Sequence, residues 1–184
     1  LDHLDDPRLA RVLRGVAEAA DWGGTRPSPP AGVKRGRGIA CGIYKAASYA
    51  AVVADVEVDT ASGAVRVRRL WSAHDCGRVI NPDHVRAQCE GNLVWGIGMV
   101  LLERLPVAAS AVAASTFADS PIPRFGDVPD IDVLIVDGGE APSGAGETAI
   151  VAAGAALANA IRDATGVRPR RLPVAASQLR AATA

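Results

Sequence analysis

The pattern of apolar and polar residues predicts a helix near the N-terminus. Apolar side chains recur at three- and four-residue spacing over residues 7–20, as on one face of a helix. Asp5 or Asp6 suits the N-cap, and Pro7 suits the first helical position. We therefore expect an amphipathic helix that packs on the rest of the chain. Residues 22–37 collect Gly, Pro, Thr and Ser, which predicts a loop.

Two strands joined by a turn are the next prediction. Valines dominate residues 48–59 and alternate with polar residues at the end of that segment, and a second alternating pattern covers residues 64–74. The Thr-Ala-Ser-Gly sequence at 60–63 predicts a turn, so the two segments form a hairpin. A row of arginines lies on one face of the second strand, and we expect it to pair with Glu57 and Asp59 on the first.

A long helix is predicted from residue 82 to about residue 103. Asn81 is a good cap for it, and Pro82 is a good first residue. Each glycine inside a helix costs roughly 1 kcal/mol relative to Ala, and this segment has glycines at positions 91, 96 and 98. They therefore indicate close packing or the approach of the backbone to a ligand. Residues 104–128 contain several prolines and predict an extended connection across the surface.

A strand, a glycine loop and an Ala-rich helix follow in that order. The apolar run at 131–136 predicts a buried strand, residues 138–150 the loop, and residues 149–161 a helix that Gly166 ends. A short docking helix is expected within 173–184. Together these elements predict an α+β fold. Its antiparallel hairpin sheet, with at least one further strand, packs against two long helices rich in small residues.

The composition fits a soluble globular protein, since 49% of the residues are hydrophobic and 22% are charged. Twenty basic and twenty acidic residues cancel, which leaves no field to attract nucleic acid or an anionic membrane. The longest apolar stretches, 93–102 and 149–161, are shorter than the ~20 residues that span a bilayer. We assign residues 1–35 to an N-terminal helix and linker, and residues 36–184 to the main domain. Because the chain starts at Leu1 without Met or a signal-type segment, we expect a piece of a longer protein.

The cysteines and histidines indicate neither a zinc site nor a disulfide scaffold. The chain has three of each, and no two cysteines form a C-x-x-C pair. No metal ligand is therefore predicted from the sequence.

Glu147 is the main candidate for chemistry because it is the ionisable side chain placed at the start of the Ala-rich helix. Glycines let a ligand approach the backbone, and free N–H groups at a helix start carry partial positive charge. A carboxylate there that is partly screened from water is a candidate general base. The alternative is a capping residue, since acidic side chains favour first helical turns. The loop also resembles a phosphate-binding loop, but Glu147 stands where the lysine belongs and would repel a triphosphate.

Beyond residue 36, an ordered series of motifs resembles the C-terminal part of the large, molybdopterin-binding subunit of the xanthine dehydrogenase and aldehyde oxidase family, the molybdenum hydroxylases. The motifs are Val56-Glu57-Val58-Asp59, His74-Asp75-Cys76-Gly77-Arg78-Val79-Ile80-Asn81-Pro82, Gln88-Cys89-Glu90-Gly91, Gly96-Ile97-Gly98, Pro142-Ser143-Gly144-Ala145-Gly146-Glu147, Ala158-Asn159-Ala160-Ile161 and Arg171-Leu172-Pro173. Within the family the sequence is most similar to the bacterial isoquinoline 1-oxidoreductase β-subunit type. It departs from the family pattern at 104–124.

The resemblance implies a molybdenum-cofactor-binding-domain-like lobe and a set of site residues. Glu147 matches the glutamate of the Gly-x-Gly-Glu motif, which acts as general base toward a Mo–OH group. That oxygen attacks an electron-poor carbon of an N-heterocycle or aldehyde. Gln88 matches the glutamine of a Gln-x-x-Gly motif and is implied to bind the cofactor, with Gly146 as its close backbone neighbour. The metal is held by a molybdopterin, in bacteria often the cytosine dinucleotide form, so the protein supplies no direct ligand.

Two hypotheses follow for the function. In the first, the chain is a fragment of a molybdenum hydroxylase that catalyses water-derived hydroxylation of an N-heterocycle or aldehyde. In the alternative it is a non-catalytic folding or assembly module, inactive without the missing cofactor-binding lobe, and we expect the isolated chain to lack the cofactor. The implied partners are the N-terminal remainder of the large subunit, a small iron–sulfur subunit and the substrate, with no nucleic acid and no membrane span. A third reading, a degenerate nucleotide-binding module, predicts stabilisation by ATP or GTP.

Overall fold

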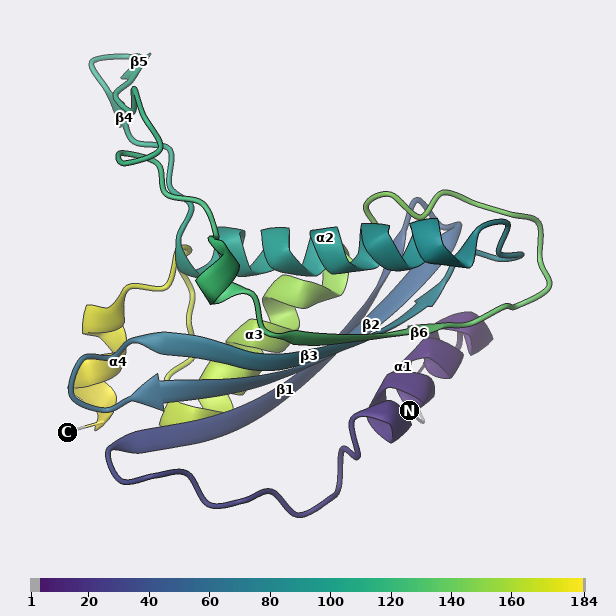
Figure 1. Cartoon of the computed structure of the whole chain (residues 1–184), viewed down its shortest axis with the longest axis horizontal. Helices are drawn as coiled ribbons and strands as arrows, with labels where there is room; N and C mark the ends of the chain where they lie inside the picture. Colours follow the sequence, from purple (N-terminus) through teal and green to yellow (C-terminus); the bar gives the residue numbers. More distant parts are fainter. Residues whose placement is uncertain (1–3, 184) are drawn as a thin grey trace.

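A four-stranded sheet organises the chain in the computed structural model, which describes residues 4–183 (Figure 1). In the order in which they lie side by side, its strands are β1 (Val33–Tyr44), β2 (Ser48–Asp59), β3 (Val65–Asp75) and β6 (Asp130–Ile135). The first three run antiparallel, and β6 joins the edge of β3 in parallel. The α+β class is confirmed. The predicted loop at 22–37 is wrong at its end, because β1 begins at Val33.

The predicted hairpin is present as β2 and β3, in a register that places Val58 opposite Val65. The expected pairing of its arginine row holds only in part. Glu57 lies 3.8 Å from Arg68, but its shorter ion pair, 2.7 Å, is with a β1 arginine. Asp59 instead accepts hydrogen bonds from the N–H and hydroxyl of Ser62 and so closes the turn.

Helices cover both faces of the sheet (Figure 1). One face carries α1 (Pro7–Ala19), and the other carries α2 (Pro82–Leu101) and α3 (Ile150–Thr165). Local capping explains their ends. The Asp6 carboxylate accepts from two N–H groups of the first α1 turn, and Gly166 ends α3 with a left-handed φ of 78°.

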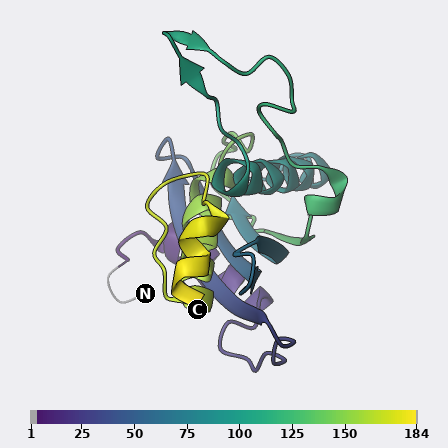
Figure 2. The same cartoon turned by 90° about the vertical axis from the view of Figure 1, so that its left-hand side faces the viewer.

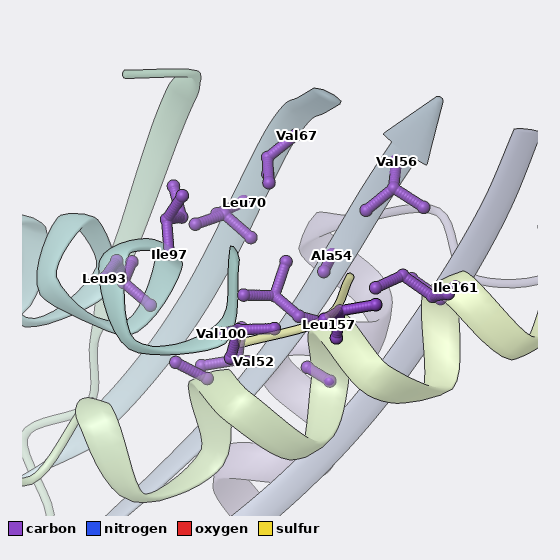
Figure 3. Close-up of a cluster of buried hydrophobic side chains, with 14 of the residues drawn as sticks. Val52, Ala54, Val56, Val67, Leu70, Leu93, Ile97, Val100, Leu157 and Ile161 are labelled. Carbon is purple, nitrogen blue, oxygen red and sulfur yellow. The ribbon is translucent and has the colours of Figure 1, made fainter. Parts of the chain in front are cut away.

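The main core lies between the sheet and the pair α2 and α3 (Figure 3). Its labelled members are Val52, Ala54 and Val56 of β2, Val67 and Leu70 of β3, Leu93, Ile97 and Val100 of α2, and Leu157 and Ile161 of α3. Small residues bring the backbones together. A Cβ added at Gly96 would lie 2.7 Å from that of Ala153 on α3, and one at Gly38 of β1 would overlap the carbonyl oxygen of Ala156. The position of α3 on the sheet is therefore fixed by backbone contact.

Residues 104–128 project away from the body of the molecule (Figures 1 and 2). They contain two short strands, β4 (Val107–Ala108) and β5 (Ala111–Val112), and a 3₁₀ turn, η1 (Phe125–Asp127). The expectation that this segment crosses the surface is therefore wrong. Its apolar side chains have nothing to pack against in the described chain, and Phe125 is fully exposed.

Two further predictions are settled by burial. The short terminal helix α4 (Ala176–Thr183) docks on the core through Leu179, which is fully buried. The β6 strand was expected to be buried, but it is an edge strand whose alternate residues are exposed, including Leu134 at 40%. None of the helices within residues 4–183 has the length and apolar character needed to cross a membrane.

Candidate functional site

The glycine loop between β6 and α3 lies against the segment that follows β3. The Arg78 N–H donates to the Glu140 carbonyl at 2.8 Å, and the Ser143 N–H donates to the Cys76 carbonyl at 2.8 Å. Between these bonds, Gly77 has a φ of 73°, and a Cβ there would overlap the carbonyl oxygen of Ala141. Two of the sequence motifs thus meet in space, and glycine is required where they touch.

Glu147 lies beyond this contact, three residues before the first residue of α3. Its side chain is exposed, and one carboxylate oxygen, Oε2, accepts a hydrogen bond from the Tyr44 hydroxyl at the end of β1. The residue before α3, Ala149, provides no side-chain cap. The interpretation of Glu147 as a capping residue is therefore wrong, since the helix starts later than expected and the carboxylate points to another element.

Gln88 and Gly146 lie next to each other, as the motif order suggested. A Cβ added at Gly146 would lie 3.7 Å from the Oε1 atom of Gln88, which is on the exposed side of α2. Gly146 precedes Glu147, so the structure brings all three candidate residues together at one end of the sheet. One turn from Gln88, Gly91 faces open space, whereas Gly96 is needed for helix packing. The helix glycines thus have different reasons.

Three residues that support this arrangement escaped the sequence analysis. The buried side chain of Asn92 hydrogen bonds the backbone on both sides of Glu147. Ser48 and Thr148, both buried, share a hydroxyl hydrogen bond of 2.6 Å between β2 and the loop. The available signal for Asn92 was its position four residues after Gln88 in an otherwise apolar helical segment, which places both on a similar face.

A buried ion pair ties α1 to the start of the loop. The Asp75 carboxylate is fully buried and accepts from the Arg8 guanidinium through Nε at 3.1 Å and Nη2 at 2.5 Å. Burial alone would raise the pKa of Asp75, but the hydrogen bonds from Arg8 and from the Gly77 N–H outweigh it, so this pKa is lowered. Arg8 also lies 3.9 Å from Glu140 of the loop.

The buried titratable groups near the loop are neutral at pH 7. Burial lowers the pKa of His74 to about 4, and neither of its ring nitrogens has a hydrogen-bond partner. Burial raises the pKa of Cys89 to about 12 and also raises that of Cys76. Neither thiol is an activated nucleophile, since reactivity needs the thiolate. Within residues 4–183, no cluster of three or more His, Cys, Asp or Glu side chains is placed to hold a metal.

The largest cavity of the described chain lies at the opposite end of β2. It has a volume of about 910 Å³ and is lined mainly by the β2–β3 turn, the end of α2 and the segment before α4. Along the strand the two ends are roughly 36 Å apart, at about 3.3 Å per residue. None of the three candidate residues lines this cavity. The Glu147 site is therefore an open surface, whose chemistry depends on what covers it.

Comparisons with known proteins match this arrangement of motifs. The family profile described as a molybdopterin cofactor-binding domain matches residues 40–129. A nicotinate dehydrogenase polypeptide of Pseudomonas putida, one subunit of that enzyme, is 42% identical over 194 residues, covering 99% of this chain and 16% of that protein. The beta subunit of isoquinoline 1-oxidoreductase from Brevundimonas diminuta is 38% identical over 175 residues, covering 95% of this chain and 22% of that protein.

Solved structures agree with the sequence matches. Quinoline 2-oxidoreductase from Pseudomonas putida 86 superposes with a TM-score of 0.67 at 30% identity, over 74% of this chain and 18% of that chain. The aldehyde oxidoreductase from Desulfovibrio gigas gives a TM-score of 0.65 at 31% identity, over 74% and 15%. The chain thus spans about a fifth or less of these relatives. By sequence and by fold, it belongs to the molybdopterin-binding subunits of the xanthine dehydrogenase and aldehyde oxidase family.

Proposed function

We propose that this chain forms part of the active site of a molybdenum hydroxylase, which inserts water-derived oxygen into an N-heterocycle or an aldehyde. Glu147 serves as its general base. The observation that carries the proposal is the position of the Glu147 carboxylate. It is exposed to an approaching ligand, held by Tyr44, and adjacent to the contact between Gly146 and Gln88.

The site suits a metal that arrives with its own organic ligand. No cluster of metal-ligating side chains lies within residues 4–183, so the described chain offers hydrogen-bonding groups instead. They are the Gln88 side-chain amide and the N–H groups of residues 144–147, which find no acceptor within the described part of the chain. N–H groups ahead of a helix attract anionic and oxygen-rich ligands. This donor set fits a molybdopterin, and we propose the cytosine dinucleotide form.

The chain's own residues then divide the work. When bound, the molybdenum group would accept the two electrons that leave the substrate carbon and would activate water for transfer to it. Gln88 hydrogen bonds the cofactor, and Gly146 leaves room for it beside that amide. Glu147 takes up a proton at the carboxylate oxygen that Tyr44 leaves free. A positioned base of this kind contributes about 10²–10⁴-fold to the rate, or roughly 3–5 kcal/mol.

Glu147→Gln in the intact subunit tests the proposal. The amide has the shape of the carboxylate but does not accept a proton, so we expect the variant to retain molybdenum and molybdopterin while kcat falls about 10²–10⁴-fold. Asp163→Asn, an exposed acid on α3 away from the loop, is the matched control and should keep full turnover. Full turnover in Glu147→Gln would remove this residue from the mechanism.

A second function is favoured by the exposure of the site. Glu147, Gln88 and Gly146 are all exposed and line none of the cavities described above, so the chain by itself encloses no ligand. A cofactor held on one side only rarely repays the cost of ordering it. The isolated 184-residue chain would then be a folding or assembly module, completed by the remainder of the large subunit and by a small iron–sulfur subunit. Molybdenum analysis of the purified chain tests this, since stoichiometric metal would contradict it.

A further inference from the structure

Asn92 is the buried polar side chain that connects α2 to the loop carrying Glu147. It is 6% exposed, and its neighbours along α2, Leu93 and Ile97, belong to the apolar core. A buried amide that finds no partners costs about 1–3 kcal/mol, so its contacts determine whether it is tolerated there. All of its hydrogen bonds go to backbone atoms near the site.

The contacts of Asn92 are specific in direction. Nδ2 donates to the Gly146 carbonyl at 2.7 Å and to the Gln88 carbonyl at 2.7 Å, while Oδ1 accepts from the Ile150 N–H at 3.3 Å. A primary amide has two hydrogens to donate and one oxygen to accept, and this orientation uses all three groups. The reversed orientation would place oxygen against two carbonyl oxygens.

These bonds span the residue that matters. Gly146 directly precedes Glu147, and Ile150 is the first residue of α3, so Asn92 holds the backbone on both sides of the carboxylate. The third bond is to the backbone of Gln88, one helical turn earlier on α2. One amide therefore fixes two groups from different elements, Glu147 and Gln88, relative to each other.

We propose that Asn92 is a positioning residue that sets the separation between the Glu147 carboxylate and the Gln88 side chain. This inference rests on the proposed function and adds a residue that neither touches the reacting atoms nor lies on the exposed surface. A displacement of about 1 Å in a reacting geometry can cost 10²-fold in rate. Support from the Tyr44 and Ser48 side remains when Asn92 is changed, so we expect a misplaced loop rather than an unfolded one.

Asn92→Asp in the intact subunit is the principal test. The shape is kept and Oδ1 still accepts from Ile150, but a carboxylate oxygen now faces two carbonyl oxygens in place of the donor. We expect kcat per bound molybdenum to fall about 10–100-fold while KM changes less than about threefold. We also expect faster amide hydrogen exchange in the peptide covering residues 144–151. Asn92→Ser, which is smaller and uncharged, is the second variant should the aspartate not fold.

Asn159→Asp provides the matched control. Asn159 also bridges elements, donating to the Ile39 carbonyl at 2.9 Å and accepting from Arg168, but it touches no part of the loop. We expect it to lower the unfolding temperature without changing kcat per molybdenum or exchange at 144–151. An equal loss of kcat in this control would overturn the inference, because stability would then be the cause.

The two failures are distinguishable when Glu147→Gln is measured beside these variants. Full turnover in Glu147→Gln overturns the proposed function. Its loss, combined with full turnover and unchanged loop exchange in Asn92→Asp and Asn92→Ser, overturns only the role of Asn92.

Discussion

His74 should make the stability of this chain fall as the pH decreases from about 6.5 to about 4. Its side chain is fully buried on β3, and neither ring nitrogen has a partner among the described residues. Burial lowers its pKa from 6.5 to about 4. Between these values the unfolded chain binds a proton at this residue and the folded chain does not, so acid favours unfolding.

The magnitude follows from the size of the shift. One pKa unit corresponds to about 1.36 kcal/mol, so a shift from 6.5 to about 4 removes about 3 kcal/mol of unfolding free energy across this range. Asp75 acts in the same direction but in a lower window. Its folded pKa is below 3.8, so the stability it contributes is lost only as the pH falls below that value. The two effects therefore separate on the pH axis.

Urea unfolding of the chain at half-unit intervals from pH 7.5 to 4 measures the effect. Wild type should lose about 1.4 kcal/mol per pH unit through the window, whereas His74→Leu should lose little, since it has no titrating group there. Because the imidazole nitrogens are unpartnered, the leucine variant should be at least as stable as wild type at pH 7. His84→Gln, on the exposed side of α2, is the control and should keep the wild-type slope. An equal slope in His74→Leu would refute the reasoning.

Two other substitutions test how the fold is held. Arg8→Met leaves the buried Asp75 carboxylate without its main partner and should cost about 3 kcal/mol at pH 7 by urea unfolding. The exposed Arg14→Met should cost less than about 0.5 kcal/mol, and equal losses would contradict the role of the ion pair. Gly91→Ala should stabilise the chain by up to about 1 kcal/mol, because the position is open, whereas Gly96→Ala should destabilise it by about 1–3 kcal/mol through the clash with α3. Thermal unfolding of the pair checks this, and a stabilised Gly96→Ala would show that the helices have room to move apart.

Local signals predicted most of the elements. Asn81 and Pro82 start α2, and Gly166 ends α3, because caps act through hydrogen bonds and dihedral angles within a few residues. The apolar alternation likewise placed β2 and β3. The parallel pairing of β6 with β3 was not predictable, since the same apolar run fits either direction and either a central or an edge position.

Glu147, Gln88 and Gly146 were recognisable as site candidates because their motifs stand in a characteristic order. Tyr44, Ser48 and Asn92 carried too little local signal to be found. A tyrosine at a strand end, a serine at a strand start and an asparagine inside a helix are each ordinary, and their partners lie 54 or more residues away for the contacts that matter.

The sequence by itself determined the elements, their ends and the family, since these depend on short-range periodicity and on the order of motifs. Only the tertiary structure decided that Glu147 does not cap α3 and that it lies beside Gln88 on an open surface. It also decided that Asn92 holds the two together. The physical reason is that a hydrogen bond between distant segments exists only after the sheet, α2 and α3 have packed, and their small residues determine how closely they pack.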